Sequence, residues 1–179
     1  MRTLLTTLGI AALLVCSQSA GACGDKLLVL GRPLRFSSSR PAAILAYAPP
    51  GSPLESVFKR PEWISAMAKG KHQLRVAQSP EQVAEALRTE RFDVVLAGWP
   101  EARNLPAQVA AAAPATVFVP FVNGNARDVA RAAEKAYGVA VKDGAKSGDY
   151  LLAIGRAVDL HDRRVEAAAR EKRNSGKSS

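Results

Sequence analysis

The chain has 179 residues, of which 47% are hydrophobic and 23% are charged, which is the size and composition of one globular domain. Its net charge of +9 would suit a nucleic-acid-binding protein, but residues 42–160 hold 14 lysines and arginines against 12 acids, so the excess lies toward the two ends of the chain. We therefore expect no nucleic-acid partner. We interpret the basic ends as solvated arms, with weak attachment to an anionic membrane surface as the alternative.

In chain order, residues 1–22 have the features of a secretory signal peptide. Arg2 gives a short positive start, residues 4–15 form an apolar run, and Ala20-Gly21-Ala22 matches a cleavage site. The apolar run is too short to span a bilayer as a stable helix. We expect cleavage after Ala22, a periplasmic or secreted location, and no transmembrane helix in the mature chain.

Cleavage at this point makes Cys23 the first residue of the mature chain and its single cysteine. Lipidation of Cys23 is one interpretation, although Ala20 is smaller than the aliphatic residue usual three positions before a lipidated cysteine. A disulfide to another chain and an unmodified thiol in a flexible arm are the alternatives. Because His72 and His161 lie far apart in the sequence and beside no predicted ligand, no metal site is predicted.

Residues 23–41 are predicted to form an arm and linker, after which apolar strands alternate with helices. Strands are predicted at residues 43–48, 73–77, 92–97, 116–121 and 139–141. Helices are predicted at residues 54–69 with a break at Pro61, 80–91, 105–113, 126–137 and 149–170. Ser79 is the predicted N-cap of the second helix, and Gly70 is predicted to end the first.

This alternation predicts an α/β fold: a doubly wound, five-stranded parallel sheet with helices on both faces, of the flavodoxin-like type. Each right-handed crossover must return to the same end of the sheet, which makes the strands parallel. We assign residues 42–164 to this domain and expect residues 165–179 to form a basic, disordered tail.

Three stretches carry a resemblance to a known family. They are residues 70–76 (GKHQLRV), residues 80–87, and residues 91–100 (RFDVVLAGWP). Together with the strand and helix spacing, they resemble the receiver domain of bacterial response regulators over about residues 42–160. Asp93 matches the first acid of the family's third-strand pattern, at the edge of the sheet opposite the family's active site.

The resemblance implies positions for the phosphoryl-transfer residues, and most of them are lost here. The metal-binding acid pair falls on Ala48 and Pro49, and the phosphoacceptor aspartate falls on Gly98. The hydroxyl position falls near Pro120 or Phe121, and only Lys142 matches the family's lysine. We therefore expect a degenerate receiver with no catalytic residues, no cofactor and no enzymatic activity.

Ligands of open α/β sheets bind beyond the carboxyl ends of the strands. Candidate residues for a ligand or partner at that edge are Ser52, Trp99, Asn123, Asn125 and Lys142. Each has a plainer alternative: Trp99 could cap the end of the sheet, the asparagines could shape a turn, and the lysine could be solvated.

Two functions are favoured by this sequence, and an enzyme with an unrecognised site is a third option. The first is a non-catalytic module that binds an envelope protein, and the resemblance implies residues 126–137 and 149–160 as its partner face. The alternative is a small-ligand-binding component, because the chain also resembles a single lobe of the periplasmic binding proteins. The sequence names neither the partner nor the ligand, and it does not predict an oligomeric state.

Overall fold

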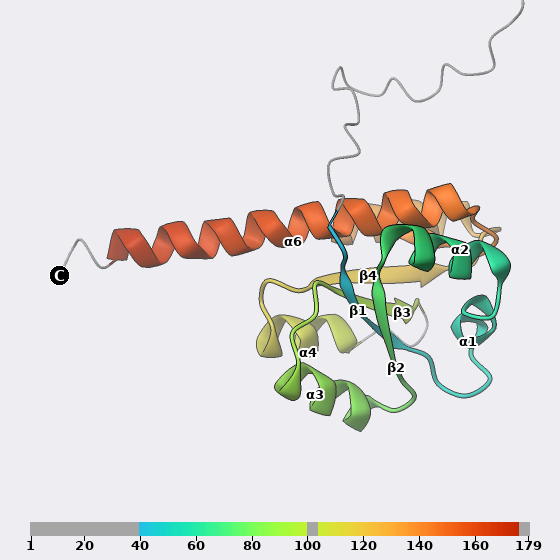
Figure 1. The fold of residues 1–179 in the computed structure, drawn as a ribbon, viewed down its shortest axis with the longest axis horizontal. Helices are drawn as coiled ribbons and strands as arrows, with labels where there is room; N and C mark the ends of the chain where they lie inside the picture. The colour runs from blue at the N-terminus through green and yellow to red at the C-terminus, as the bar shows by residue number, and fades with distance from the viewer. Residues whose placement is uncertain (1–39, 100–103, 176–179) are drawn as a thin grey trace, which may run out of the picture. The chain divides into compact units, whose positions relative to one another are not determined.

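A computed structural model describes residues 40–99 and 104–175 (Figure 1). The predicted signal peptide, Cys23 and most of the predicted arm lie outside the described residues. The strands are β1 (Ala43–Tyr47), β2 (Gln73–Ala77), β3 (Val94–Gly98), β4 (Val117–Val122) and β5 (Val141–Lys142). The helices are α1 (Pro53–Val57), α2 (Pro61–Gly70), α3 (Pro80–Thr89), α4 (Leu105–Ala112), α5 (Arg127–Tyr137) and α6 (Ser147–Ser175).

The five strands form one parallel sheet in the order β2-β1-β3-β4-β5. This confirms the predicted fold class, and the reversal of strand order occurs between β1 and β3. The fully buried strands β3 and β4 are continuous apolar runs, as parallel strands covered on both faces require. Thr116 is buried just before β4, and its hydroxyl donates to the carbonyl of Phe92 at 2.7 Å.

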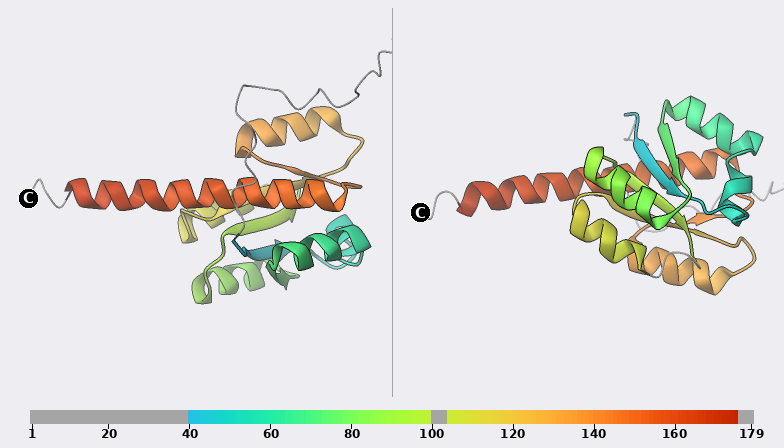
Figure 2. Two further views of the ribbon diagram at one scale, coloured as in Figure 1. Left: turned by 45° about the horizontal axis from the view of Figure 1, so that its top comes forward. Right: turned by 90° about the horizontal axis from the view of Figure 1, so that it is seen from below.

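Two layers of helices cover the sheet, as Figures 1 and 2 show. Helices α1, α2 and α6 pack on one face, around Trp63 and Tyr150, whose rings meet edge to face at 5.2 Å. Helices α3 and α4 pack on the other face, around Val83, Leu87 and Phe118. Helix α5 packs against Val122 of β4 through Ala130 and Ala133. Because strand side chains alternate, Val122 lies on the same face as Phe118.

Most predicted helix boundaries hold because the local signals are strong. Pro61 separates α1 from α2, as predicted, and Ser79 caps α3, since its hydroxyl accepts a hydrogen bond from the Gln82 N–H at 3.3 Å. Gly70 does not end its helix in the predicted way. It is the last residue of α2, and the left-handed residue is Lys71, with φ 52°.

Gly70 is required for a different reason. A Cβ atom at this position would lie 2.0 Å from Nε2 of His72. The His72 ring occupies that space and accepts a hydrogen bond from the Ala42 N–H at Nδ1, over 3.0 Å. Glycine therefore lets the imidazole reach the start of β1, and burial lowers the pKa of His72.

Helix α6, which is predicted to end near residue 170, continues to Ser175, so residues 165–175 are helical and do not form the disordered tail expected for residues 165–179. Figure 1 shows this part of α6 running past the amino ends of the strands. The sequence from Arg156 to Ser175 holds neither glycine nor proline, and residues 167–169 are alanines. Arg170 also pairs with Glu166 one turn earlier, at 3.7 Å. Helix propensity therefore extends the helix where side chains have no core to pack against.

Candidate functional site

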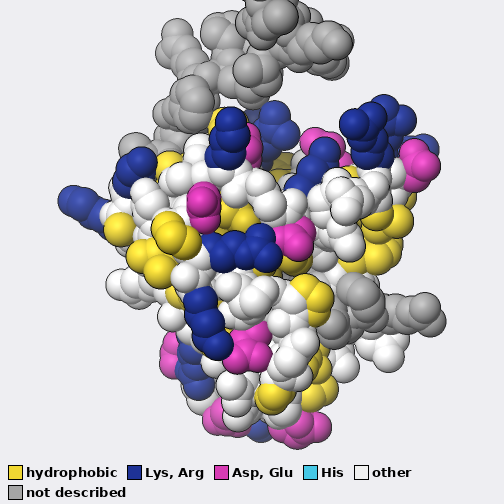
Figure 3. All heavy atoms as spheres, turned by 90° about the vertical axis from the view of Figure 1, so that its right-hand side faces the viewer, with side chains coloured by type: hydrophobic (Ala, Val, Ile, Leu, Met, Phe, Trp, Pro, Cys, Tyr) yellow, Lys and Arg dark blue, Asp and Glu magenta, His cyan; other side chains and the backbone are white. Residues whose placement is uncertain are grey.

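The carboxyl edge of the sheet holds the positions that the receiver resemblance assigns to chemistry. The register pairs Gly98 with Phe121, and Val122 with Lys142, so the ends of β3, β4 and β5 lie side by side. Ala48 follows β1, with its N–H donating to the Ala77 carbonyl at 2.9 Å. Of these residues, only Lys142 has an ionisable side chain, and it is exposed. Figure 3 shows this end of the molecule, with acidic and basic side chains interspersed among hydrophobic ones.

A cavity of about 300 Å³ opens at this edge. Its lining is mainly apolar, and Asn123 and Asp143 are its polar members. The cavity is lined by, among others, Leu54, Gly98, Trp99, Phe121, Asn123 and Asp143. Two of the five predicted crest residues, Trp99 and Asn123, line it. The other three, Ser52, Asn125 and Lys142, do not.

Three of the crest residues, Ser52, Asn123 and Trp99, have side chains with a structural role. The Ser52 hydroxyl accepts a hydrogen bond from the Glu55 N–H at 3.4 Å and caps α1. Asn123 Oδ1 accepts from the Asn125 N–H at 3.0 Å, which is the turn geometry given above as the plainer alternative. Trp99 meets the Tyr137 ring edge to face at 6.1 Å and so packs the end of β3 against α5.

Sequence reasoning missed an ion pair at this edge. Arg60, in the turn before α2, donates to Asp143 Oδ1 after β5 at 2.5 Å. Below it, the hydroxyl of Tyr150 is buried without a hydrogen-bond partner among the described residues, and burial raises the pKa of Tyr150. No sequence motif links these residues, because Arg60 and Asp143 are 83 positions apart.

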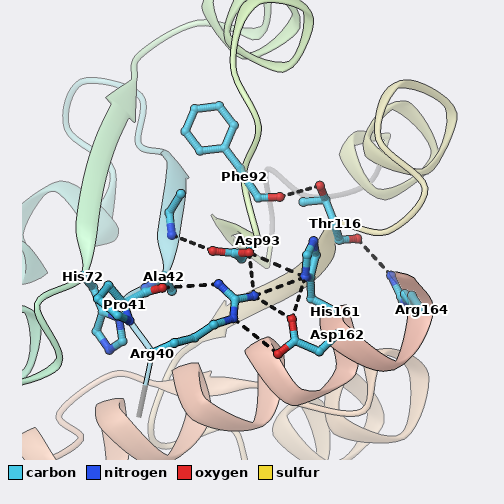
Figure 4. Close-up of polar contacts among 11 residues, drawn as sticks. Arg40, Pro41, Ala42, His72, Phe92, Asp93, Thr116, His161, Asp162 and Arg164 are labelled. Atoms are coloured by element: carbon cyan, nitrogen blue, oxygen red, sulfur yellow. Dashed lines mark hydrogen bonds and ion pairs between the residues drawn. The ribbon is translucent and has the colours of Figure 1, made fainter. Parts of the chain in front are cut away.

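The amino edge of the sheet holds a second charged cluster, shown in Figure 4. Arg40 lies between two carboxylates, at 2.9 Å from Asp93 Oδ1 and 2.6 Å from Asp162 Oδ1. Asp93 Oδ2 also accepts from the Ala43 N–H at 2.7 Å, and Nδ1 of His161 lies 3.2 Å from Asp162. The expectation that His161 has no ligand-like neighbour is therefore wrong.

Ion pairs and hydrogen bonds in this cluster connect the start of β1 to α6. Partial burial opposes ionisation of Asp93, but hydrogen bonds from Arg40 and the Ala43 N–H hold its pKa below the usual range. The hydrogen bond from Arg40 likewise lowers the pKa of Asp162, and the two carboxylates raise that of Arg40. The guanidinium occupies the space between the acids, and residues 40–99 and 104–175 contain no group of acids, histidines and cysteines that could hold a metal ion.

A third feature lies on the side of the molecule formed by α5, β5 and α6, here called the interaction face. It contains a hollow of about 450 Å³. Its lining includes Glu134, Lys142, Asp149, Leu152 and Arg156. Arg156 of α6 pairs with Glu134 of α5 at 3.4 Å across the hollow. These helices are the ones that the resemblance assigns to partner binding.

Helices long and apolar enough to cross a membrane do not occur among the residues that the structure describes.

No family model and no curated protein sequence matches the chain. Solved structures are similar to it. One is the adenylate cyclase from Rhodopirellula baltica, 13% identical, which covers 74% of this chain and 98% of its own with a TM-score of 0.55. Another is the signal receiver domain of an HD domain-containing protein from Pseudomonas fluorescens Pf-5, 16% identical, with coverages of 69% and 98% and a TM-score of 0.51.

A response regulator receiver domain protein from Clostridium thermocellum is also similar, 16% identical, with coverages of 66% and 94% and a TM-score of 0.50. At such identities the likeness concerns the fold alone. The predicted receiver-like fold is confirmed, and the function must be argued from the sites of this chain.

Proposed function

We propose that this chain is a non-catalytic, exported receiver-like domain that binds a protein of the cell envelope through its interaction face. The observation that carries the proposal is the hollow between α5 and α6, which is bridged by the Arg156–Glu134 pair and lined by Leu152. A concave surface with an apolar floor and a charged rim has the anatomy of a protein interface.

The carboxyl edge supports the non-catalytic part of the proposal. Mg²⁺ is held by oxygen ligands, and a phosphoryl group needs a nucleophilic acceptor. Ala48 and Gly98 provide neither, since one side chain is a methyl group and the other is a hydrogen. The exposed Lys142 is the one family residue retained, and a lysine alone cannot accept and release a phosphoryl group in the manner of a receiver.

The location comes from the sequence. The features of residues 1–22 favour export, and a receiver in that compartment would lack the ATP-dependent kinases that normally supply its phosphoryl group. Selection would then keep the scaffold and its binding face while the phosphorylation site decays. Lipidation of Cys23 would tether the same module to a membrane.

Charging the hollow tests the partner-binding claim. Leu152→Arg places a cation beside the Arg156–Glu134 pair. Ile64→Arg is a matched control, because Ile64 lies on the solvent side of α2 and is 55% exposed. We expect affinity purification after cross-linking in the host envelope to recover one partner with the wild type and with Ile64→Arg, and at least tenfold less with Leu152→Arg. Equal recovery by all three chains would contradict the proposal.

The cavity at the carboxyl edge supports a second candidate, the binding of a small ligand. Its volume of about 300 Å³ is at the lower end of ligand pockets, and Asn123 and Asp143 could orient a mainly apolar molecule. A ligand at a hundred times its Kd would stabilise the fold by about 2.7 kcal/mol. A metabolite screen by thermal melting would detect this, and the shift should disappear in Asn123→Ala. No shift across the screen would eliminate this candidate.

A further inference from the structure

The amino edge of the sheet carries a groove that the proposed function does not use. It has a volume of about 710 Å³ and lies between the ends of α3 and α4 and the part of α6 that runs past the sheet. Its lining includes Leu87, Arg91, Phe92, Pro114, His161 and Val165. We call it the amino-edge groove. It lies at the opposite edge of the sheet from the carboxyl-edge cavity.

Hydrogen bonds fix the floor of the groove to its α6 wall. Arg164 donates to the Thr116 carbonyl at 2.9 Å, and the Thr116 hydroxyl donates to the Phe92 carbonyl at 2.7 Å. Two residues earlier on α6, Asp162 is held by Arg40 (Figure 4). The wall is therefore held in place before anything binds, which reduces the entropy cost of binding.

The wall presents an apolar stripe to solvent. Val165 is 46% exposed, although it lines the groove. Helical periodicity places Ala168, Ala169 and Lys172 on the same stripe as Val165, further along the exposed part of α6. The groove thus continues along α6 as a strip of small apolar side chains that ends in a lysine.

Among the residues described around the groove, the acidic side chains form ion pairs, whereas two basic side chains do not. Its acids are neutralised within the domain, since Glu90 pairs with Arg75 and Asp93 pairs with Arg40. By contrast, neither Arg91 nor Lys172 forms an ion pair with any residue in the described ranges. The charges available to a binding partner are therefore the positive charges of Arg91, in the groove, and of Lys172, at the end of the stripe.

We infer that the amino-edge groove binds a short acidic segment of another protein, one that carries apolar side chains along one side. The apolar side chains would cover Val165 and the alanine stripe, and the acids would meet Arg91 and Lys172. This surface is separate from the interaction face, so the inference stands or falls independently of the proposed function.

Selection from a random peptide library on the purified, processed chain tests the chemistry of the occupant directly. We expect enriched peptides to be rich in Asp and Glu and to carry large apolar residues at helical spacing. Their binding should weaken at least tenfold in Val165→Glu and in Arg91→Glu. Ile64→Glu and Arg127→Glu make the same changes at exposed sites outside the groove and should bind as the wild type does.

Amide NMR shifts with an enriched peptide locate the site. We expect shifts at residues 88–93, 112–116 and 161–172, unchanged in Leu152→Arg, the variant that tests the proposed function. Enrichment of basic peptides, or binding that ignores Val165→Glu and Arg91→Glu, would overturn the inference. It would also be overturned if sedimentation showed self-association through Val165, or if vesicles of anionic lipid competed with the peptide.

Discussion

The two edges of the same sheet use charged residues in different ways. At the amino edge, Arg40 is inserted between Asp93 and Asp162 and joins the start of β1 to α6. At the carboxyl edge, the strand ends carry Ala48 and Gly98, and the Arg60–Asp143 pair joins two loops above them. The strand ends at the carboxyl edge, where a receiver has its active site, thus carry no functional groups at Ala48 and Gly98. At the amino edge, ion pairs of Arg40 hold β1 and α6 together.

Removing the central acid of the amino edge should give the largest effect, and the same change at the carboxyl edge gives the comparison. Asp93→Ala leaves the Ala43 N–H without an acceptor and leaves Arg40 with Asp162 as its remaining carboxylate partner, and we expect it to cost about 2 kcal/mol of unfolding free energy. Asp143→Ala should cost less than about 1 kcal/mol, because both members of its pair are about one-third exposed. Urea denaturation measures both values. Equal losses would remove the distinction between the edges.

The next largest effect concerns Gly70 at the amino edge. Gly70→Ala places a methyl group against the His72 ring and should break its hydrogen bond with the Ala42 N–H, for a loss of about 1.5 kcal/mol. Gly148→Ala in the first turn of α6 is the matched control, since a Cβ there has no neighbour within 4 Å. Thermal melting should show destabilisation in the first variant and none in the second.

Titration should separate two contributions to stability. The pKa of His72 is lowered in the fold, so the unfolded chain binds the proton more readily and stability falls as the pH drops below about 6.5. The pKa values of Asp93 and Asp162 are also lowered, so their contribution is complete above about pH 4 and is lost below it.

Denaturation of His72→Asn and Asp93→Ala across this pH range tests the assignment. The histidine variant should lose the pH dependence that begins below about pH 6.5 and keep the one below about pH 4. The aspartate variant should keep the dependence below about pH 6.5 and show a smaller one below about pH 4, where Asp162 still contributes. An unchanged profile in both variants would show that other groups set the pH dependence.

The smallest effect is expected in the exposed part of α6. Glu166→Ala removes the pair with Arg170 and should destabilise the helix there by about 0.3 kcal/mol. Amide hydrogen exchange should speed up between residues 166 and 175 and remain unchanged in the sheet. Faster exchange throughout the domain would mean that this part of α6 contributes to the core.

The sheet could be predicted from sequence because its signals are local. Runs such as residues 94–98 and 117–122 are apolar at every position, and Pro61 and Ser79 mark helix starts. Helix α6 ends five residues beyond the predicted boundary near residue 170, because its alanines and the absence of helix-breaking residues outweigh its basic composition. The two charged clusters could not have been foreseen, since their members are distant in sequence and are brought together only by the crossovers of the fold.

The central claim, that this receiver-like domain binds a protein through its interaction face, is tested most directly by hydrogen exchange with the partner recovered from the host envelope. We expect the partner to slow amide hydrogen exchange in α5 and in residues 149–156 of α6. Slowed exchange confined to the loops at the carboxyl edge, or no change in the domain at all, would contradict it.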